Sequence, residues 1–302
     1  MRVFVTGATG VMGRSAARAL QRAGHAVVGL ARDDANAECL AAEGVEPVRA
    51  RLFDPDSLAE AFAGCTVVCN MATCAPIGMQ ALRSRAWRAH DRIRSEGSRS
   101  VVAAARRAGV QRIVQESASA LYADAGEEWI DERSPITVNR AVEPAVLAEA
   151  NAEDFGGATR DWVVLRFGAI VGDDAFTAWR LARARTGHAI GLGDPRGWTH
   201  LVHSDDVGSA VLASLSAPSG TYNVGAQPVR RIELVDAFAE AVGRTRVGYM
   251  PRVLQRIGGE RAELLTRSQR VSSDALMQAA AWKPIHKYFG VEWLTEKTAE
   301  RV

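Results

Sequence analysis

The sequence predicts an α/β fold, in which a doubly wound parallel sheet carries a smaller, mainly helical lobe toward the C-terminal end. Three observations support this prediction. A short apolar run, a glycine-rich turn and an amphipathic stretch open the chain within residues 1–22. Apolar runs of strand length then alternate with helical stretches as far as about residue 172, which is typical of parallel sheets. Beyond that point the alternation weakens, and most of the remaining segments have a helical pattern.

The opening unit predicts a Rossmann-type dinucleotide site. Val3–Val5 are expected to form a short buried strand, and glycines follow at positions 7, 10 and 13 before an amphipathic helix. Such a turn lets a pyrophosphate approach the backbone, and the free N–H groups at the start of the helix hold its charge. A tight turn without a ligand is the alternative, but three evenly spaced glycines exceed what a turn needs.

The end of the second strand bears on the choice of cofactor. His25–Leu30 is expected to be that strand, with Arg32 at its tip, while Arg14 follows the third glycine. In dinucleotide folds an acidic residue at this tip binds the ribose 2′-hydroxyl, whereas an Arg accommodates a 2′-phosphate. The two arginines therefore favour NADP(H) over NAD(H). Asp33 and Asp34 are the contrary observation, and the alternative for Arg32 is an ordinary solvated loop residue.

The other elements follow from periodicity and from residues that start or stop helices. Further strands are expected at Pro47–Ala50, Thr66–Asn70, Gln111–Glu116, Trp162–Arg166 and Thr221–Val224. Helices are expected at Ala35–Glu43, Ala81–Ala108, Ala141–Ala158 and Asp174–Thr186. Two more helices are expected to begin at side-chain caps, one at Asp54 or Asp56 and one at Ser204 or Asp205.

These elements predict two structural parts. Residues 1–172, joined again by residues 201–226, are expected to form the dinucleotide-binding domain, and residues 173–200 and 227–302 the substrate-binding lobe. The segment 187–198 is rich in glycine and other hinge residues, so it is either a lid over the substrate or a disordered connection.

Composition narrows the class of protein. The chain has 302 residues with a net charge of +2, which gives no basic field for nucleic acid. No apolar run approaches membrane-spanning length, and a strand beginning at residue 2 leaves no room for a signal peptide. A cytoplasmic location is therefore expected. The four cysteines, at positions 39, 65, 69 and 74, are expected to be reduced and mostly buried, and no metal site is predicted, although Cys65 and Cys69 leave a remote one open.

Six motifs together resemble the extended short-chain dehydrogenase/reductase superfamily, in its NAD-dependent epimerase/dehydratase branch. They are Thr6–Gly13, Ser117–Tyr122, Leu165–Gly168, His203–Asp206, Thr221–Val224 and Arg270–Pro284. The resemblance covers nearly the whole chain and implies the fold and a nicotinamide dinucleotide, but no particular reaction. The residues expected at the cofactor are Gly7, Thr9, Gly10, Val11, Met12, Gly13, Arg14, Arg32, Leu52, Ala72 and Phe167. For Phe167, simple core packing is the alternative, and His203 is expected to be structural.

The chain departs from this family in its catalytic residues. Family members usually carry a Ser or Thr, then a Tyr with a Lys four residues later, and that Tyr is the general acid. The corresponding positions here are Ala118, Ala141 and Ala145, and none of the four tyrosines has a Lys four positions on. Ser117 and Ser119 are the nearest groups that could supply a proton or stabilise an alkoxide, although capping of the strand end explains them equally well.

The expected function is an NADPH-dependent ketoreductase acting on a bulky aromatic ketone of polyketide type. The chain resembles ketoreductases that lack the triad and modify aromatic polyketides, the angucyclinone ketoreductases among them. Hydride transfer belongs to the cofactor and can proceed without the Tyr–Lys pair if another group or the substrate's own hydroxyl assists. Tyr122 and Trp198 are expected at the substrate, and Trp87, Trp129 and Trp179 are further tryptophans that could line an aromatic pocket.

Two alternatives remain open at this point. One is an epimerase or dehydratase acting on a nucleotide sugar, which the missing Tyr disfavours. The other is a non-catalytic NADP(H)-binding regulator, which fits the loss of the triad directly. The expected partner is a small-molecule substrate, without nucleic acid or membrane, and the protein is expected to be a monomer or a homodimer.

Overall fold

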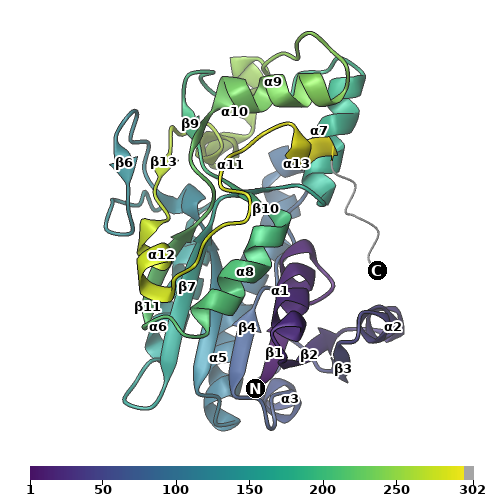
Figure 1. Cartoon of the computed structure of the whole chain (residues 1–302), viewed down its shortest axis with the longest axis vertical. Coiled ribbons are helices and arrows are strands. Elements are labelled where there is room, and N and C mark those ends of the chain that lie inside the picture. Colours follow the sequence, from purple (N-terminus) through teal and green to yellow (C-terminus); the bar gives the residue numbers. More distant parts are fainter. Residues whose placement is uncertain (296–302) are drawn as a thin grey trace.

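The computed structural model describes residues 1–295, and for Leu82, Arg252, Leu254 and Gln255 it describes the backbone alone. Seven parallel strands form the central sheet (Figure 1), which confirms the predicted α/β class. From edge to edge they are β11 (Gly220–Val224), β7 (Asp161–Phe167), β5 (Arg112–Ala118), β4 (Val67–Asn70), β1 (Arg2–Thr6), β2 (Ala26–Ala31) and β3 (Glu46–Arg49). The strand order reverses between β1 and β4, and open α/β sheets bind ligands outside the carboxyl ends of the strands at such a point.

Helices cover both faces of the sheet, so its strands are apolar almost throughout. Side chains alternate between the faces: Val3 and Val5 join one apolar cluster, whereas Phe4 joins the other. The first cluster is shared with α1 (Val11–Arg22), α2 (Asp34–Ala42), α8 (Ser204–Ser214) and α12 (Asp274–Ala280). The second is shared with α3 (Pro55–Ala61), α5 (Ser98–Arg107) and α6 (Glu143–Phe155).

Helix starts follow local side-chain chemistry, with one correction. Asp54 caps α3 as predicted, since its carboxylate accepts the backbone N–H groups of Asp56 and Ser57. The cap of α8 was predicted wrongly, because His203 rather than Ser204 or Asp205 occupies that position. The His203 ring accepts the backbone N–H of Asp205 at 3.3 Å, which places Ser204 inside the helix.

The stretch 81–108 is not one continuous helix, which corrects the prediction. It contains η1 (Gly78–Leu82), η2 (Ser84–Trp87), α4 (Arg88–Arg92), the π-helical turn η3 (Ile93–Gly97) and α5. Arg83 has an extended backbone that stops the first turn, and the Trp87 indole donates to the Ala81 carbonyl at 2.8 Å. The predicted helix over 141–158 is also shorter, because Pro144 lies in the first turn of α6 and Gly156 ends it.

The remaining elements lie above the carboxyl ends of the strands in Figure 1. They include α7 (Ala175–Arg185), α9 (Arg231–Ala241), α10 (Arg252–Ile257), α11 (Gly259–Leu264) and α13 (Glu292–Thr295). Three short two-stranded ladders were not predicted: β8 (Ala169–Val171) with β10 (Leu201–His203), β9 (Trp198–Thr199) with β12 (Val229–Arg230), and β6 (Trp129–Ile130) with β13 (Arg270–Val271). Strands of two or three residues are too short to show a period. The predicted boundary between two parts stays a prediction, and its last residues, 296–302, lie outside the described chain.

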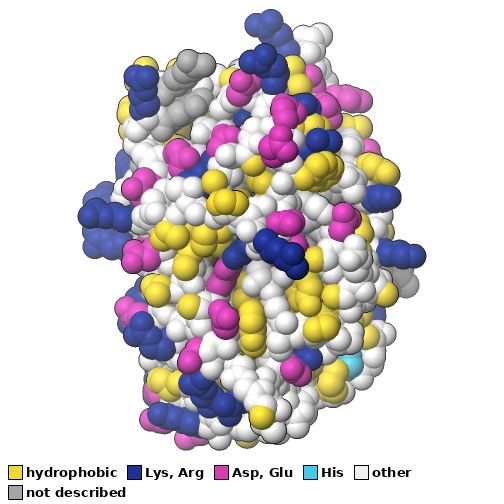
Figure 2. All heavy atoms as spheres, turned by 90° about the vertical axis from the view of Figure 1, so that its left-hand side faces the viewer, with side chains coloured by type: hydrophobic (Ala, Val, Ile, Leu, Met, Phe, Trp, Pro, Cys, Tyr) yellow, Lys and Arg dark blue, Asp and Glu magenta, His cyan; other side chains and the backbone are white. Residues whose placement is uncertain are grey.

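The distribution of charge on the surface and the state of the cysteines can be compared with what the sequence predicts. On the face that Figure 2 shows, basic and acidic side chains are interspersed, in keeping with the small net charge of +2. Over residues 1–295, no helix is long and apolar enough to cross a membrane. All four cysteines are free, as predicted, but Cys39 and Cys74 are exposed, so only Cys65 and Cys69 are buried thiols.

Candidate active site

The glycine turn after β1 requires glycine at two positions. Gly7 has a φ of +64°, and a Cβ there would lie 2.7 Å from the Cα of Ala72. A Cβ on Gly13 would lie 2.2 Å from the carbonyl oxygen of Gly7, because α1 packs directly against the turn. Gly10 stands at the N-cap of α1 without a side-chain cap, so the first N–H groups of that helix are available to an anion. The turn fits the pyrophosphate of a dinucleotide.

A polar chain holds the strand ends beside this turn. Thr6 donates to the side-chain oxygen of Asn70 at 2.6 Å, and the Asn70 amide donates to that of Gln115 at 2.8 Å. All three side chains are buried, at the carboxyl ends of β1 and β4 and within β5. They fix the course of Met71 and Ala72 past Gly7. Sequence reasoning missed this chain, although a polar residue closing an apolar strand was a visible signal.

At the tip of β2, the two acidic side chains form hydrogen bonds or ion pairs, whereas the arginine does not. The Asp33 carboxylate caps α2 by accepting the backbone N–H of Asn36 at 2.8 Å, and a second hydrogen bond, from the Asn36 side-chain amide, lowers the pKa of Asp33. Asp34 is ion-paired with Arg49. Arg32 is exposed and, among the described residues, has no hydrogen bond or ion pair. Asp33 and Asp34, the observation contrary to NADP(H), are therefore already bonded to Asn36 and Arg49.

The other residues predicted at the cofactor lie near the turn or at the adjoining strand ends. Thr9 donates to the side-chain oxygen of Asn36 at 3.2 Å. In the first turn of α1, Met12 is buried, whereas Val11 and Arg14 are half-buried. Leu52 lies beside Gly97 at the end of η3, Ala72 follows β4, and Phe167 closes β7 with 3% of its surface exposed.

A cavity of about 340 Å³ lies at the carboxyl ends of β5 and β7, against helix α11. It is lined by Ala118, Ala141 and Ala145, the three positions that the sequence resemblance predicts for the family's catalytic triad. Phe167 and Ser119 also line it. Positions far apart in the sequence therefore meet at one cavity, but their methyl groups offer no acid or base. Its other lining residues include Trp87, His90, Arg94, His200, Arg231, Arg261, Leu264, Leu265, Arg267 and Gln269.

Ser119 belongs to a buried hydroxyl–imidazole–hydroxyl chain. Its Oγ lies 3.0 Å from Nδ1 of His200, and Nε2 of His200 lies 3.4 Å from the Oγ of Ser273. Burial lowers the pKa of His200 to about 3, so this imidazole is neutral at physiological pH. Sequence reasoning missed His200 and Ser273, because only the fold brings β5, the start of β10 and the start of α12 together.

Ser117 and Tyr122 lie in a different network, outside the cavity lining. Ser117 donates to Glu149 at 2.6 Å, and Glu149 forms an ion pair of 2.7 Å with Arg166. Arg166 donates to the Tyr122 hydroxyl at 2.9 Å, and this hydroxyl in turn donates to Asn223 at 2.8 Å. Tyr122 is fully buried, and burial raises the pKa of its phenol. The geometry therefore gives Ser117 and Tyr122 a structural part, and the expectation of substrate contact for Tyr122 is not carried further.

The predicted tryptophans divide between two surroundings. Trp198 does not line the cavity; its indole donates to Glu127 at 2.9 Å, and the Arg230 guanidinium lies 3.8 Å from its ring centre. Trp129 is 51% exposed. Trp87 lines the cavity, and together with Trp179 it lines a smaller apolar cavity of about 70 Å³ beside it. Trp87, and not Trp198, is therefore the tryptophan placed to contact a substrate in this cavity.

The glycine-rich segment 187–198 is tied to the C-terminal elements at several points. Ile190 donates its backbone N–H to Gly248 at 3.1 Å, and Met250 donates to Gly191 at 2.8 Å. Ile232 donates to the Pro195 carbonyl at 2.8 Å. These bonds order the segment in this conformation, and whether it moves as a lid stays a prediction.

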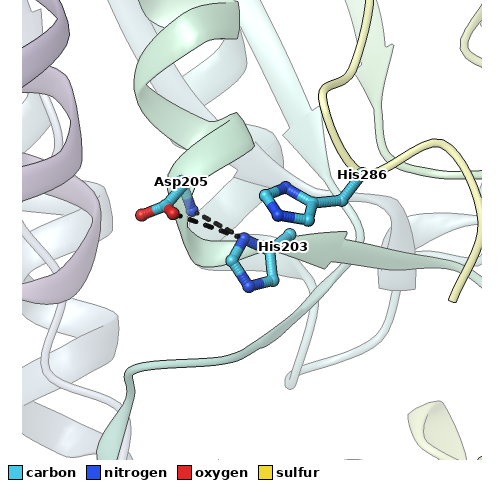
Figure 3. Close-up of side chains that lie close together, drawn as sticks. All are labelled: His203, Asp205 and His286. Atoms are coloured by element: carbon cyan, nitrogen blue, oxygen red, sulfur yellow. Dashed lines mark hydrogen bonds and ion pairs between the residues drawn. The ribbon is translucent and has the colours of Figure 1, made fainter. Parts of the chain in front are cut away.

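One group of side chains within residues 1–295 has spacing suited to a metal ion, namely His203, Asp205 and His286 (Figure 3). Their ligand atoms lie within 4.8 Å of one another. The two imidazole rings lie against each other with centres 3.7 Å apart and planes tilted by 32°. Nδ1 of His203 caps α8, and Nδ1 of His286 lies 3.1 Å from the carboxylate of Asp206. The cluster is accounted for as a helix cap and a clamp on the chain near residue 286, in keeping with the structural part expected for His203.

Sequence comparison identifies relatives of known activity. Residues 3–225 match the model of the NAD dependent epimerase/dehydratase family. A 3-diazoavenalumate denitrifying reductase from a Streptomyces species is 30% identical, with 95% of this chain and 97% of that protein covered. A 2-alkyl-3-oxoalkanoate reductase from Stenotrophomonas maltophilia is 29% identical over 82% of this chain and 77% of that protein. A 4-hydroxy-2-methyl-3-oxo-4-farnesyl-3,4-dihydroquinoline-1-oxide ketoreductase from Stigmatella aurantiaca is 34% identical over 50% of this chain and 44% of that protein.

Solved structures support the same fold. Human epimerase family protein SDR39U1, crystallised with NADPH, superposes with a TM-score of 0.82 at 22% identity and covers 98% of both chains. MoeE5 in complex with UDP-glucose and NAD superposes with a TM-score of 0.76 at 22% identity over 97% of this chain and 96% of that one. At this level of identity the likeness concerns the fold alone.

Proposed function

This chain belongs to the NAD dependent epimerase/dehydratase family, and from that premise we propose that it is an NADPH-dependent ketoreductase for a bulky aromatic ketone. One observation carries the proposal. The cavity at the carboxyl ends of β5 and β7 holds alanine at all three triad positions and one hydroxyl, Ser119, hydrogen-bonded to a neutral histidine. Two relatives named as reductases align over most of the chain, and a third is named a ketoreductase of a farnesylated quinoline oxide.

The cofactor supplies the hydride, so the protein must position the substrate and satisfy the oxygen that becomes an alkoxide. Holding the two reactants together contributes up to about 7–11 kcal/mol to lowering the barrier, whereas a positioned acid contributes about 10²–10⁴-fold in rate. Loss of the Tyr–Lys pair therefore leaves the larger contribution in place. An aromatic substrate with a hydroxyl beside its carbonyl adds an internal hydrogen bond of its own.

Ser119 is the protein group we assign to the carbonyl oxygen. As the alkoxide forms, the Ser119 hydroxyl gives it a proton, and Nδ1–H of His200 replaces that proton over 3.0 Å. Nε2 of His200 then takes a proton from Ser273, 3.4 Å away, and a proton from solvent water restores the Ser273 hydroxyl. The low pKa of His200, about 3, keeps the ring neutral between turnovers, so it relays protons without holding a charge.

The test of this proposal is a turnover assay with NADPH and a panel of polycyclic aromatic ketones, followed by loss of NADPH absorbance and by product mass. We expect a product heavier by two hydrogen atoms. Ser119→Ala is expected to lower kcat by about 10²-fold at unchanged NADPH affinity, whereas its matched control Ser117→Ala, outside the cavity, changes kcat much less. NADPH binding without oxidation by any ketone would instead favour a cofactor-binding regulator.

The absence of the family's tyrosine acid also suits a second candidate reaction, the reductive removal of a diazo group. The relative that aligns over 97% of its length is named as a denitrifying reductase of a diazo compound. When hydride attacks the carbon of an aryl diazonium, a C–H bond forms, the C–N bond breaks and N2 leaves with the bonding electrons. This reaction needs no proton donor, so three alanines at the triad positions suit it. Nitrogen release from a model aryl diazonium at the expense of NADPH, unchanged in Ser119→Ala, would favour it over ketone reduction.

A further inference from the structure

The charges around the cavity are unevenly placed. Arginines line it, but no carboxylate does among the described residues. The four guanidiniums come from separate parts of the chain: Arg94, Arg231, Arg261 and Arg267. Arg94, Arg261 and Arg267 are ion-paired with carboxylates that are not among the lining residues. Arg231 donates to the backbone carbonyls of Asp194 and Arg267 instead.

Arg94 is held in a fixed position by this arrangement. Its Nε and Nη2 donate to the two carboxylate oxygens of Glu116 at 3.1 Å and 2.8 Å. Glu116 lies in β5 with a side chain only 2% exposed, so the pair is anchored to the central sheet. Within the described chain, the third nitrogen of Arg94, Nη1, has no hydrogen bond, and the residue lines the cavity. The π-helical turn at Ile93–Gly97 sets this side chain apart from the regular helices before and after it.

Arg261 faces the cavity from the opposite element, α11. It donates to the Ala141 carbonyl at 2.6 Å and to the Asp91 carboxylate at 2.5 Å, through Nη1 and Nη2. Its guanidinium lies 4.5 Å from the centre of the Trp87 ring. These contacts hold the Arg261 guanidinium in place. Within the described residues, its Nε makes no hydrogen bond.

His90 adds a third donor between the two arginines. Burial, and after it the charges of Arg94 and Arg261, lower the pKa of His90 to about 2. The ring is therefore neutral, and its Nδ1 accepts the backbone N–H of Cys74 at 3.4 Å. The remaining proton is then on Nε2, which leaves His90 a hydrogen-bond donor at the cavity that carries no charge of its own.

An aromatic surface continues from this cationic end. The smaller cavity shares Trp87, Arg261 and Leu265 with the main one. It is otherwise apolar, and the rings of Phe176 and Trp179 are stacked in its wall with centres 5.7 Å apart. A flat hydrocarbon group can thus extend from the arginines into an apolar pocket.

We infer that the site is built for an aromatic substrate bearing a carboxylate, with Arg94, Arg261 and His90 as the groups that hold the carboxylate. This inference rests on the proposed function and names its substrate class. A guanidinium is the donor best matched to a planar anion, and charge-assisted hydrogen bonds are about twice as strong as neutral ones. Two of the reductases that resemble the chain are named for carboxylates, an avenalumate and an oxoalkanoate.

The experiment compares two probes of the same shape, trans-cinnamate and trans-cinnamamide, by calorimetric titration of the whole chain saturated with NADP⁺. We expect cinnamate to bind at least tenfold more tightly than its neutral amide. The double variant Arg94→Gln/Glu116→Gln removes both charges of one pair, so that no buried carboxylate is left unpaired. It is expected to abolish most of this preference while changing cinnamamide binding by less than twofold.

Arg99→Gln is the matched control, because Arg99 is an exposed arginine on the neighbouring turn. It should leave both affinities unchanged. If the double variant fails to fold by circular dichroism, Arg261→Gln/Asp91→Asn asks the same question from the other side of the cavity. Equal affinity for the two probes, no saturable cinnamate binding, or an equal loss of both probes in the folded variant would overturn the inference. Because binding is measured without turnover, a failure of ketone reduction leaves this result readable.

Discussion

Two regions at the carboxyl ends of the strands differ in what shapes them. One is the glycine turn after β1, and the other is the cavity beside α11. The turn depends on backbone, with Gly7 and Gly13 in positions that a single methyl group would block. The cavity depends on side chains from distant elements, with buried ion pairs such as Arg94–Glu116 and neutral histidines such as His200. The first region has the glycine geometry and the uncapped helix start that suit a dinucleotide, whereas the second has alanine at the three positions predicted for the triad.

If the proposed function holds, binding a nicotinamide cofactor and protonating a product are separable tasks within one fold. The first task depends on backbone geometry at Gly7 and Gly13, where an added Cβ would clash. Protonation of the product can be carried out by another hydroxyl or by the substrate itself. It is not needed at all when hydride transfer expels a neutral leaving group.

The largest effect is expected beside the cavity, at the buried pair of Glu149 and Arg166. Their side chains are 11% and 9% exposed. Glu149→Ala leaves the Arg166 charge without its carboxylate, which is expected to lower the free energy of unfolding by about 3–5 kcal/mol. Urea unfolding measures this loss, with the exposed Glu153→Ala on the same helix as control. A loss no greater than that of the control would show that Tyr122 and Asn223 suffice to hold Arg166.

The next effect is expected at the glycine turn, for Gly13→Ala. The added Cβ would lie 2.2 Å from the Gly7 carbonyl oxygen, so the helix must move away from the turn. Overpacking of this kind costs about 1–3 kcal/mol, and NADPH binding should weaken with it. At Gly10 the nearest atom to a Cβ is 3.3 Å away, so Gly10→Ala should cost clearly less stability. Equal melting temperatures for the two variants would contradict the backbone account of this region.

A smaller effect is expected at Arg32, where the structure leaves a guanidinium free at the tip of β2. Arg32→Ala is expected to weaken NADPH binding by about tenfold, since one charge-assisted contact to a phosphate is lost, and to leave NADH binding nearly unchanged. Arg22→Ala, at the exposed end of α1, is the control. Equal loss for both cofactors would refute NADP(H) selection by Arg32.

The smallest effect concerns pH and two histidines at the cavity. The pKa of His90 is lowered to about 2 and that of His200 to about 3, so both are neutral in the folded protein. The unfolded chain binds a proton at each near its ordinary pKa of about 6.5, so their contribution to stability is full above that pH and is lost as pH falls. Each is expected to account for about 1 kcal/mol of the stability lost between pH 6 and pH 5.

Thermal or urea unfolding at the two pH values tests this expectation. His90→Gln and His200→Gln should each reduce the pH-dependent loss, whatever they do to stability at neutral pH. His188→Gln, at an exposed position, should not. An unchanged pH dependence in both cavity variants would mean that these imidazoles take up protons in the folded state.

The contrast between the regions also explains what the sequence could predict. All seven strands of the sheet and the glycine turn were predictable, because apolar runs and glycine spacing are local patterns. The chain His200–Ser119–Ser273 was not, since its members are brought together only by the fold. Trp198 was assigned to the substrate by residue type alone, and its partner Glu127 holds it elsewhere. The predicted helix over 81–108 is interrupted at Arg83, whose extended backbone has no signal in the local sequence pattern.

We propose that net hydride transfer occurs at this cavity without the family's tyrosine. The most direct measurement uses NADPH carrying deuterium at the transferred position of C4, an aromatic ketone with a carboxylate, and mass spectrometry of the product. The account predicts one deuterium on the carbon that was the carbonyl carbon, with one NADPH consumed per product. Product without deuterium, or NADPH that remains unoxidised while substrate is converted, would contradict it and point to the epimerase type of chemistry instead.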